Sequence, residues 1–153
     1  MLIRRATSDD AELLATHRAA VWIEVGDWAR ADLEPQVAVW TAFFSGALRN
    51  GTYVGFIAER DGRVAGSGAV LIHASIPRPG FASDRAGRVQ SVYVDPNARH
   101  QGVARAIMQY ILDFARSAQL ISLSLHPSDP ARSLYAALGF EAADEMTLRL
   151  APG

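Results

Sequence analysis

Residues 90–105 read Gln-Ser-Val-Tyr-Val-Asp-Pro-Asn-Ala-Arg-His-Gln-Gly-Val-Ala-Arg. An apolar strand pattern ends at Asp95-Pro96, and a helix then opens on small residues at Gly102 and Ala104. The first turn of a helix carries unpaired backbone N–H groups and the positive end of the helix dipole. Because glycine has no Cβ, a ligand can approach the backbone at Gly102. The segment therefore predicts an anion site that suits a phosphate or a pyrophosphate.

The loop within this segment also carries positive charge, from Arg99, His100 and Arg105. It is not a dinucleotide-binding fingerprint, because the pattern GxGxxG is absent. It is not a P-loop either, because the chain contains no lysine. A plain strand–turn–helix unit, in which Gly102 only lets the helix pack tightly, is the structural alternative.

The sequence on either side has the patterns of one layered α/β domain without internal repeats. Apolar stripes at helical spacing predict helices near 9–22, 35–48, 102–118 and 130–138. Short apolar segments predict strands at 2–6, 53–59, 63–72, 88–94, 120–125 and 146–150. Asp61-Gly62 is expected to form a hairpin turn, and Asp9 with Glu12 a capping box. The expected order of elements is β-α-α-β-β-β-α-β-α-β.

The composition excludes several classes of protein. The chain has 153 residues, of which 50% are hydrophobic and 20% charged, as is typical of one globular domain. A net charge of −1 provides no electrostatic footprint for nucleic acid. Without cysteine or lysine, the chain cannot use disulfides, zinc–thiolate sites, a cysteine nucleophile or Schiff-base chemistry. The sequence shows no secretory signal and no membrane-spanning apolar run, so we expect a cytosolic protein without a membrane partner.

Two blocks of the sequence resemble motifs of one enzyme family. Arg99-x-x-Gly102-x-Ala104, directly after a predicted strand, is similar to the acetyl-CoA motif Q/R-x-x-G-x-G/A of the GNAT superfamily of N-acetyltransferases. Residues 128–140, Ser-Asp-Pro-Ala-Arg-Ser-Leu-Tyr-Ala-Ala-Leu-Gly-Phe, resemble the family's N-x-x-A-x-x-L-Y-x-x-x-G-F stretch. The blocks lie in the family's order and separation. The resemblance implies a single acetyltransferase domain over residues 1–153, with a central mixed, mostly antiparallel sheet flanked by about four helices.

The resemblance also implies roles for particular residues. The backbone of three strand residues is expected to pair with the pantetheine arm of acetyl-CoA, namely Val92, Tyr93 and Val94. The pyrophosphate loop is expected to comprise Arg99, His100, Gln101, Gly102, Val103, Ala104 and Arg105. The N–H of Val94 is expected to hold the oxyanion, and Tyr135 to be the general acid that protonates the departing CoA sulfur. Ala104 replaces a commoner glycine, which the family tolerates, whereas Ser128 replaces a common asparagine and leaves its cofactor contact open.

Some of these residues have structural alternatives. Tyr135 lies on the stripe formed by Ala131, Leu134 and Leu138, so it is alternatively a core aromatic. Gly66-Ser67-Gly68 lacks the context of a hydrolase nucleophile elbow and is expected to form a strand bulge or a close backbone approach. The histidines do not share metal-ligand spacing, so we expect no metal site.

The stretch Trp22-Ile-Glu24-Val-Gly-Asp27-Trp28 combines aromatic and acidic residues. In members of the family this helical region usually lines the acceptor pocket. Acidic residues beside tryptophan suit a cationic amine, through charge and through cation–π attraction. The equal alternative is that these residues form a core or homodimer surface.

The implied reaction is direct transfer, in which a neutral amine attacks the thioester carbonyl within a ternary complex. No cysteine is present to carry an acyl group. We expect acetyl-CoA as co-substrate and a primary amine of a small molecule as acceptor. The alternatives are a peptide or protein amine, or a non-catalytic acetyl-CoA-binding domain. Residues 121–125 offer no carboxylate, so the amine is expected to lose its proton to water and not to a dedicated base.

Overall fold

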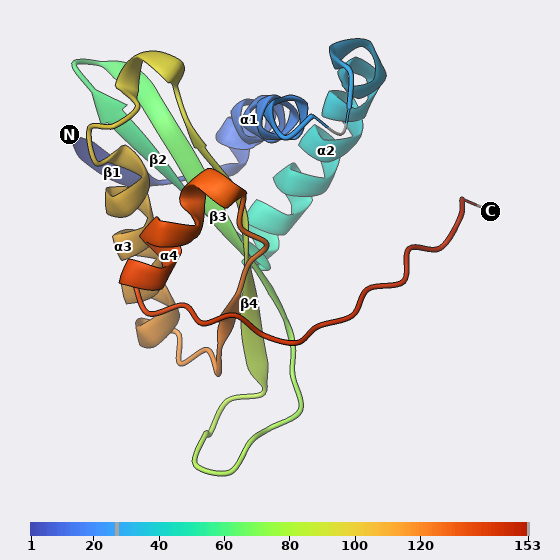
Figure 1. Ribbon diagram of the computed structural model, residues 1–153, viewed down its shortest axis with the longest axis vertical. Coiled ribbons are helices and arrows are strands. Elements are labelled where there is room, and N and C mark those ends of the chain that lie inside the picture. The colour runs from blue at the N-terminus through green and yellow to red at the C-terminus, as the bar shows by residue number, and fades with distance from the viewer. Residues whose placement is uncertain (27, 153) are drawn as a thin grey trace.

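The computed structural model describes residues 1–26 and 28–152, and these residues form one sheet with helices on both faces (Figure 1). The sheet has five strands in the order β1-β2-β3-β4-β5. They are β1 (Leu2–Arg5), β2 (Tyr53–Arg60), β3 (Arg63–Ala74), β4 (Arg85–Val94) and β5 (Leu123–Ser124). Neighbours pair antiparallel, except that β4 and β5 pair parallel. The predicted mixed, mostly antiparallel sheet is confirmed.

Four α-helices cover this sheet, with α1 and α2 on one face and α3 and α4 on the other (Figure 1). They are α1 (Ala11–Glu24), α2 (Arg30–Asn50), α3 (Val103–Ser117) and α4 (Arg132–Ala137). Short 3-10 helices are η1 (Ser8–Asp10), η2 (Pro96–Ala98) and η3 (Asp129–Ala131). The number and order of the α-helices agree with the sequence prediction.

Each face of the sheet has its own apolar core. On the α3 side, Ile107, Met108 and Ile111 are fully buried at 0% exposure, because the predicted stripe of α3 faces the strands. On the other side, α1 and α2 bury a second cluster that includes Leu14 and Phe44. Burial of each large apolar side chain contributes about 1.5–3 kcal/mol. The two cores fix the sheet between the helices and so hold the strand ends in place.

The hairpin between β2 and β3 turns at Asp61 and Gly62, as predicted. Both residues have positive φ, 51° and 74° respectively. A two-residue turn of this kind matches the twist of the flanking strands and favours an Asp-Gly pair. The turn therefore sets the pairing of β2 with β3 from Arg60 opposite Arg63.

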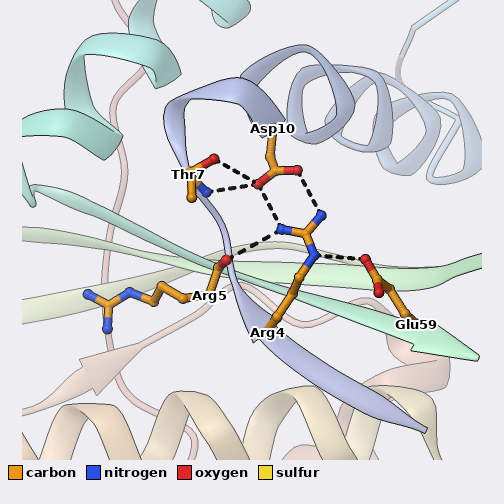
Figure 2. A network of polar contacts seen from close by, with 5 residues as sticks. All are labelled: Arg4, Arg5, Thr7, Asp10 and Glu59. Atoms are coloured by element: carbon orange, nitrogen blue, oxygen red, sulfur yellow. Dashed lines mark hydrogen bonds and ion pairs between the residues drawn. The ribbon is translucent and has the colours of Figure 1, made fainter.

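The corner between β1 and α1 is held by one carboxylate, that of Asp10 (Figure 2). It accepts hydrogen bonds from Nη1 and Nη2 of Arg4, each at 2.9 Å, and from the backbone N–H of Thr7 at 2.8 Å. Arg4 also donates from Nε to Glu59 on β2 at 2.7 Å. The guanidinium of Arg4 lowers the pKa of Asp10. The capping interaction predicted for Asp9 and Glu12 is therefore wrong: Thr7 and Asp10 make it, at the start of η1.

The largest differences from the sequence prediction are the start of α2 and the absence of the last expected strand. Helix α2 begins at Arg30, and Pro35 lies inside it, because burial of Leu33 draws the earlier turn into the helix. The strand expected at residues 146–150 does not form within the described residues. There, Met146 is 98% exposed and Leu148 84% exposed. The free neighbour is β5, which spans only two residues and so offers too short an edge for pairing.

Candidate functional site

The outer edge of β4 is open along its C-terminal half. β5 pairs only with Gly87 and Arg88, so within the described residues no strand lies against this outer edge of β4 beyond them. The N–H of Asp95 donates to the carbonyl of Ala65 on β3 at 2.8 Å. Because hydrogen-bonded and non-hydrogen-bonded pairs alternate in an antiparallel ladder, the N–H and C=O of Val94 point away from β3, toward the open edge. An extended ligand arm can pair there as an added strand.

A bulge splays β4 just before this open stretch. The register between β3 and β4 shifts between Ser67 and Ala69, and on β4 Ser91 has a φ of 52°. A Cβ added to Gly68 would lie 2.8 Å from Cγ2 of Ile107, so only glycine lets α3 approach this closely. The sequence expectation of a bulge or close approach at residues 66–68 is confirmed. A bulge increases local twist, which directs the rest of β4 away from β5.

The predicted anion loop lies between β4 and α3. Its residues His100 and Gly102 have positive φ, 60° and 80°, and Gly102 is the N-cap of α3. A Cβ added to Gly102 would meet nothing within 4 Å, so the loop faces open space. The first intrahelical hydrogen bond of α3 runs from the N–H of Ala106 to the carbonyl of Gly102, at 3.0 Å. The N–H groups of the preceding helical residues Val103, Ala104 and Arg105 therefore remain available to an anion.

Two side chains of this loop hold the loop itself. Arg99 donates from Nε to the carbonyl of Val94 at 3.2 Å, and its Nη2 pairs with the carboxylate of Glu24. Gln101 donates to the carbonyl of Asn97 at 3.2 Å and accepts from Arg60. The charge of Arg99 is paired with Glu24 in this structure, and its expected contact with a phosphate stays a prediction. His100 and Arg105 stay exposed, as the prediction requires.

Tyr135 lies on α4, at the edge of the core. It is 9% exposed and packs against Phe140, with ring centroids 5.9 Å apart. It also lines a cavity of about 540 Å³ together with Arg88, Ser124 and His126. Burial raises the pKa of its phenol, so the hydroxyl stays protonated throughout the neutral range.

The hydroxyl of Tyr135 makes no hydrogen bond with another described residue, and no side-chain oxygen in that part of the chain is both buried and unpartnered. It therefore faces the cavity. The ring of Tyr135 thus packs in the core, while its hydroxyl remains free to donate a proton. Ser128 precedes η3, where its side chain makes no capping hydrogen bond.

Sequence reasoning did not identify two polar contacts between α1 and the sheet. Nδ1 of His17 lies 2.6 Å from Oγ of Ser67, and the imidazole packs on the ring of Tyr93 with centroids 4.3 Å apart. Arg18 donates from Nη1 to Gln90 and Ser91 of β4. The only available signal was a histidine on an otherwise apolar helix stripe. Burial lowers the pKa of His17 to about 4, so this imidazole is neutral at pH 7.

Two of the predicted acceptor residues, Trp22 and Trp28, lie together near the C-terminal end of α1. Trp22 stacks on Trp28 with centroids 5.8 Å apart and meets Trp40 edge-on at 5.4 Å. Glu24 lies nearby on α1, but its carboxylate pairs with Arg99. Asp27 lies outside the described residues. The structure thus supports the aromatic part of the predicted cluster, whereas the charge of Glu24 is already matched.

The described part of the chain offers neither a metal site nor a membrane-spanning helix. Residues 1–26 and 28–152 contain no group of three His, Asp or Glu side chains placed to hold a metal ion. Among the helices in these ranges, none combines the length and the apolarity that crossing a membrane requires.

Comparison with known proteins places this geometry in a family. Residues 15–140 match the model of the acetyltransferase (GNAT) family. A glucosamine 6-phosphate N-acetyltransferase of Trypanosoma brucei brucei is 30% identical over 95 residues, which cover 62% of this chain and 62% of that protein. The N-alpha-acetyltransferase RimI of Mycobacterium tuberculosis is 26% identical over 135 residues, covering 88% of this chain and 75% of that protein. A Clostridium acetobutylicum structure, described as a predicted acetyltransferase with acetyl-CoA, is 25% identical with a TM-score of 0.85, covering 98% and 95% of the two chains.

Proposed function

The chain belongs to the acetyltransferase (GNAT) family, and we propose that it moves an acetyl group from acetyl-CoA directly to a primary amine of a small molecule. It is an acetyl-CoA-dependent acyltransferase. The proposal adds the class of acceptor, the ternary complex and the residues that act in it. The observation that carries it is the continuity between the open edge of β4 at Val94 and the helix start at Gly102.

The residues present fit acetyl-CoA, which when bound supplies an activated thioester. The backbone of Val92 to Val94 lies along the open edge of β4, which suits the amide groups of a pantetheine arm. The free N–H groups at the start of α3 suit a pyrophosphate. The open space around Gly102 leaves room for that group to approach the backbone. These features support Val92 to Val94 and His100 to Arg105 as the binding residues.

Two groups of the chain then serve the transfer. As the amine attacks, negative charge develops on the carbonyl oxygen, and the N–H of Val94 is the donor that we assign to hold it. The phenol of Tyr135 is the proton donor that we assign to the departing sulfur, because burial keeps it protonated. The amine must be neutral to attack, and we propose that it loses its proton to water.

A small-molecule acceptor is supported by the aromatic residues of α1, of α2 and of the turn between them. Trp22, Trp28 and Trp40 pack together there and offer a compact apolar wall. The matched glucosamine 6-phosphate acetyltransferase is named for a small amine. A peptide or protein amine is the second candidate, because RimI is named as an N-alpha-acetyltransferase and its match covers 88% of this chain. A non-catalytic acetyl-CoA-binding domain is the third, and the free hydroxyl of Tyr135 counts against it.

Three further expectations stay proposals. We propose that the protein acts in the cytosol without a metal ion. We also retain the homodimer, for which the exposed Trp28, at 48% exposure, is the surface candidate. If Trp28 lies in a dimer interface, it is not part of the acceptor pocket.

An amine screen tests the function. The purified chain is incubated with acetyl-CoA and single members of an amine library, and release of CoA is followed with a thiol reagent. The three arms are small amines, peptides with a free N-terminal amine, and a reaction without amine. We expect release above the amine-free rate with small amines, and mass spectrometry should show the acetylated amine. Turnover of peptides alone would favour the second candidate, and binding of acetyl-CoA without turnover in any arm would favour the third.

A further inference from the structure

Arg18 is a cation held in place by uncharged groups. It lies on α1, half-buried against the bulged part of β4. Its Nη1 donates to Oε1 of Gln90 and to Oγ of Ser91, both at 3.0 Å. These two bonds fix one corner of the guanidinium plane over the strand, within the part of β4 whose outer edge is open.

Two indole rings fix the rest of the plane. Cζ of Arg18 lies 4.8 Å from the ring centroid of Trp22 and 5.1 Å from that of Trp40. Trp22 is in turn backed by Trp28. A guanidinium held beside two aromatic rings is stabilised by cation–π attraction and loses little further freedom when it binds an anion.

The charge of Arg18 has no carboxylate against it in the described ranges, 1–26 and 28–152. The five ion pairs found there involve Arg4, Arg99, Arg116 and Arg132. Burial lowers the pKa of Arg18, which shows that this environment disfavours the charge. Polar groups and rings compensate a half-buried charge only in part, so an anion bound beside it would be favoured.

The remaining donors of Arg18 are accessible. Nε and Nη2 make no hydrogen bond with another described residue. No side-chain nitrogen in this part of the chain is both buried and unpartnered, so these two atoms reach solvent. Nε and Nη2 form one side of the guanidinium fork, whose geometry matches a carboxylate or phosphate through two parallel hydrogen bonds.

The position of this fork suits a group on the acceptor. Ser91, which anchors Arg18, precedes Val94 by three residues on the same strand. At about 3.3 Å per residue, the two positions are separated by roughly 10 Å or less. A small molecule can span this distance, with its anion at Arg18 and its amine near the N–H of Val94.

We propose that Arg18 binds a carboxylate or phosphate group of the acceptor amine, so that the substrates are amines that also carry an anionic group. This inference rests on the proposed function, and it differs from the sequence expectation that the acceptor is a cationic amine. That expectation drew on Glu24, Asp27 and the neighbouring tryptophans; the carboxylate of Glu24 is paired with Arg99, and Asp27 lies outside the described residues. The site instead presents a cation to the acceptor.

Paired acceptors test the inference. Each pair has one carbon skeleton with and without the anion: 4-aminobutanoate with 4-aminobutanamide, and 3-aminopropyl phosphate with 3-aminopropanol. The first pair tests a carboxylate and the second a phosphate. We expect kcat/KM to be about tenfold or more higher for the anionic member of at least one pair, chiefly through a lower KM. Equal kcat/KM within both pairs would overturn the inference while leaving the proposed function intact.

Variants separate binding from a structural role. Arg18→Gln should reduce the preference for the anionic member by about tenfold, and Arg18→Lys should retain part of it. Arg116→Gln, an exposed arginine on α3, is the matched control and should keep the preference. Equal losses for both members of each pair in folded Arg18→Gln would show that Arg18 only tethers α1, and the inference would fail.

If no amine turns over, the proposed function fails, and calorimetric binding of the same anionic amines to the acetyl-CoA-saturated protein decides the anion site. Binding that Arg18→Gln abolishes would support it. Binding that persists in the variant, or no binding in the wild type, would overturn it.

Discussion

Nδ1 of His17 lies 2.6 Å from Oγ of Ser67, which joins the middle of α1 to the bulged part of β3 across 50 residues of sequence. Both residues are buried, at 8% and 1% exposure. The imidazole also packs on Tyr93, which precedes Val94 on the open edge of β4. This pair therefore fixes α1 on the sheet directly beneath the strand to which we assign the acetyl-CoA arm.

The burial of His17 predicts a pH-dependent stability. Its pKa falls from 6.5 to about 4 in the folded protein, so between these values the unfolded chain binds more protons. The contribution of neutral His17 to the free energy of unfolding is fully present above pH 6.5 and is lost as the pH falls toward 4. The complete loss amounts to about 3 kcal/mol. Urea unfolding at pH 7 and pH 5 should show about 2 kcal/mol of this loss in the wild type.

The matched variants for that measurement are His17→Gln and His73→Gln. His73 is exposed at the end of β3 and should leave the pH dependence unchanged. His17→Gln should flatten it. An identical slope in His17→Gln and in the wild type would assign the pH dependence to other groups.

Gly102→Glu should abolish binding of acetyl-CoA, because it places a side chain and a negative charge where a pyrophosphate is expected. Gly80→Glu is a close control: Gly80 also has a positive φ, 85° against 80°, and also faces open space. Both variants carry similar backbone strain, so only the first should lose affinity in calorimetry. Retained affinity in a folded Gly102→Glu protein would remove the loop from the binding site.

Tyr135→Phe keeps the ring and its packing on Phe140 but removes the hydroxyl proton. If the phenol is the general acid, kcat should fall by roughly ten- to ten-thousand-fold, with little change in acetyl-CoA affinity. Tyr110→Phe, on the exposed side of α3, is the control and should keep the wild-type kcat. An unchanged kcat in Tyr135→Phe would leave Tyr135 with its core role alone.

The pH dependence of the rate tests the absence of a protein base. If the amine loses its proton to water, log kcat/KM should rise toward the pKa of each acceptor and shift when the acceptor is changed. Several amines of different pKa, measured under the same conditions, give this comparison. An inflection that stays near pH 6 to 7 for all of them would reveal a protein base such as His73.

The parts of the fold that the sequence predicted are those that depend on local pattern. The stripe of α3 and the Asp61-Gly62 turn each carry their information within a few residues. The loop at Gly102 is also local, since the strand end, the glycine and the helix start are consecutive. These elements place most of the proposed cofactor site.

The missed features depend on residues far apart in the chain. The pair of Glu24 and Arg99 joins positions 75 residues apart, and it matches the charge of one of the two carboxylates on which a cationic acceptor depended. Arg18 and Ser91 are 73 residues apart. Helical periodicity shows which face of α1 is apolar, but it does not show which strand residues that face meets.

The last expected strand failed for a related reason. Residues 146–150 alternate apolar and polar side chains, which is the pattern of a half-buried strand. A strand also needs a neighbour to complete its hydrogen bonds, and β5 presents only two residues. The alternating pattern of residues 146–150 is local, whereas the length of the neighbouring strand with which they would pair depends on tertiary structure.

Direct transfer to an amine is the central claim, and the two-substrate initial-rate pattern tests it most directly. Rates are measured over a grid of acetyl-CoA concentrations and concentrations of the best acceptor from the screen. Reciprocal plots should intersect, because both substrates must be bound before the acetyl group moves. Parallel lines, together with an acetylated protein detected by mass spectrometry in the absence of amine, would show that the group first passes to the chain and would contradict the account.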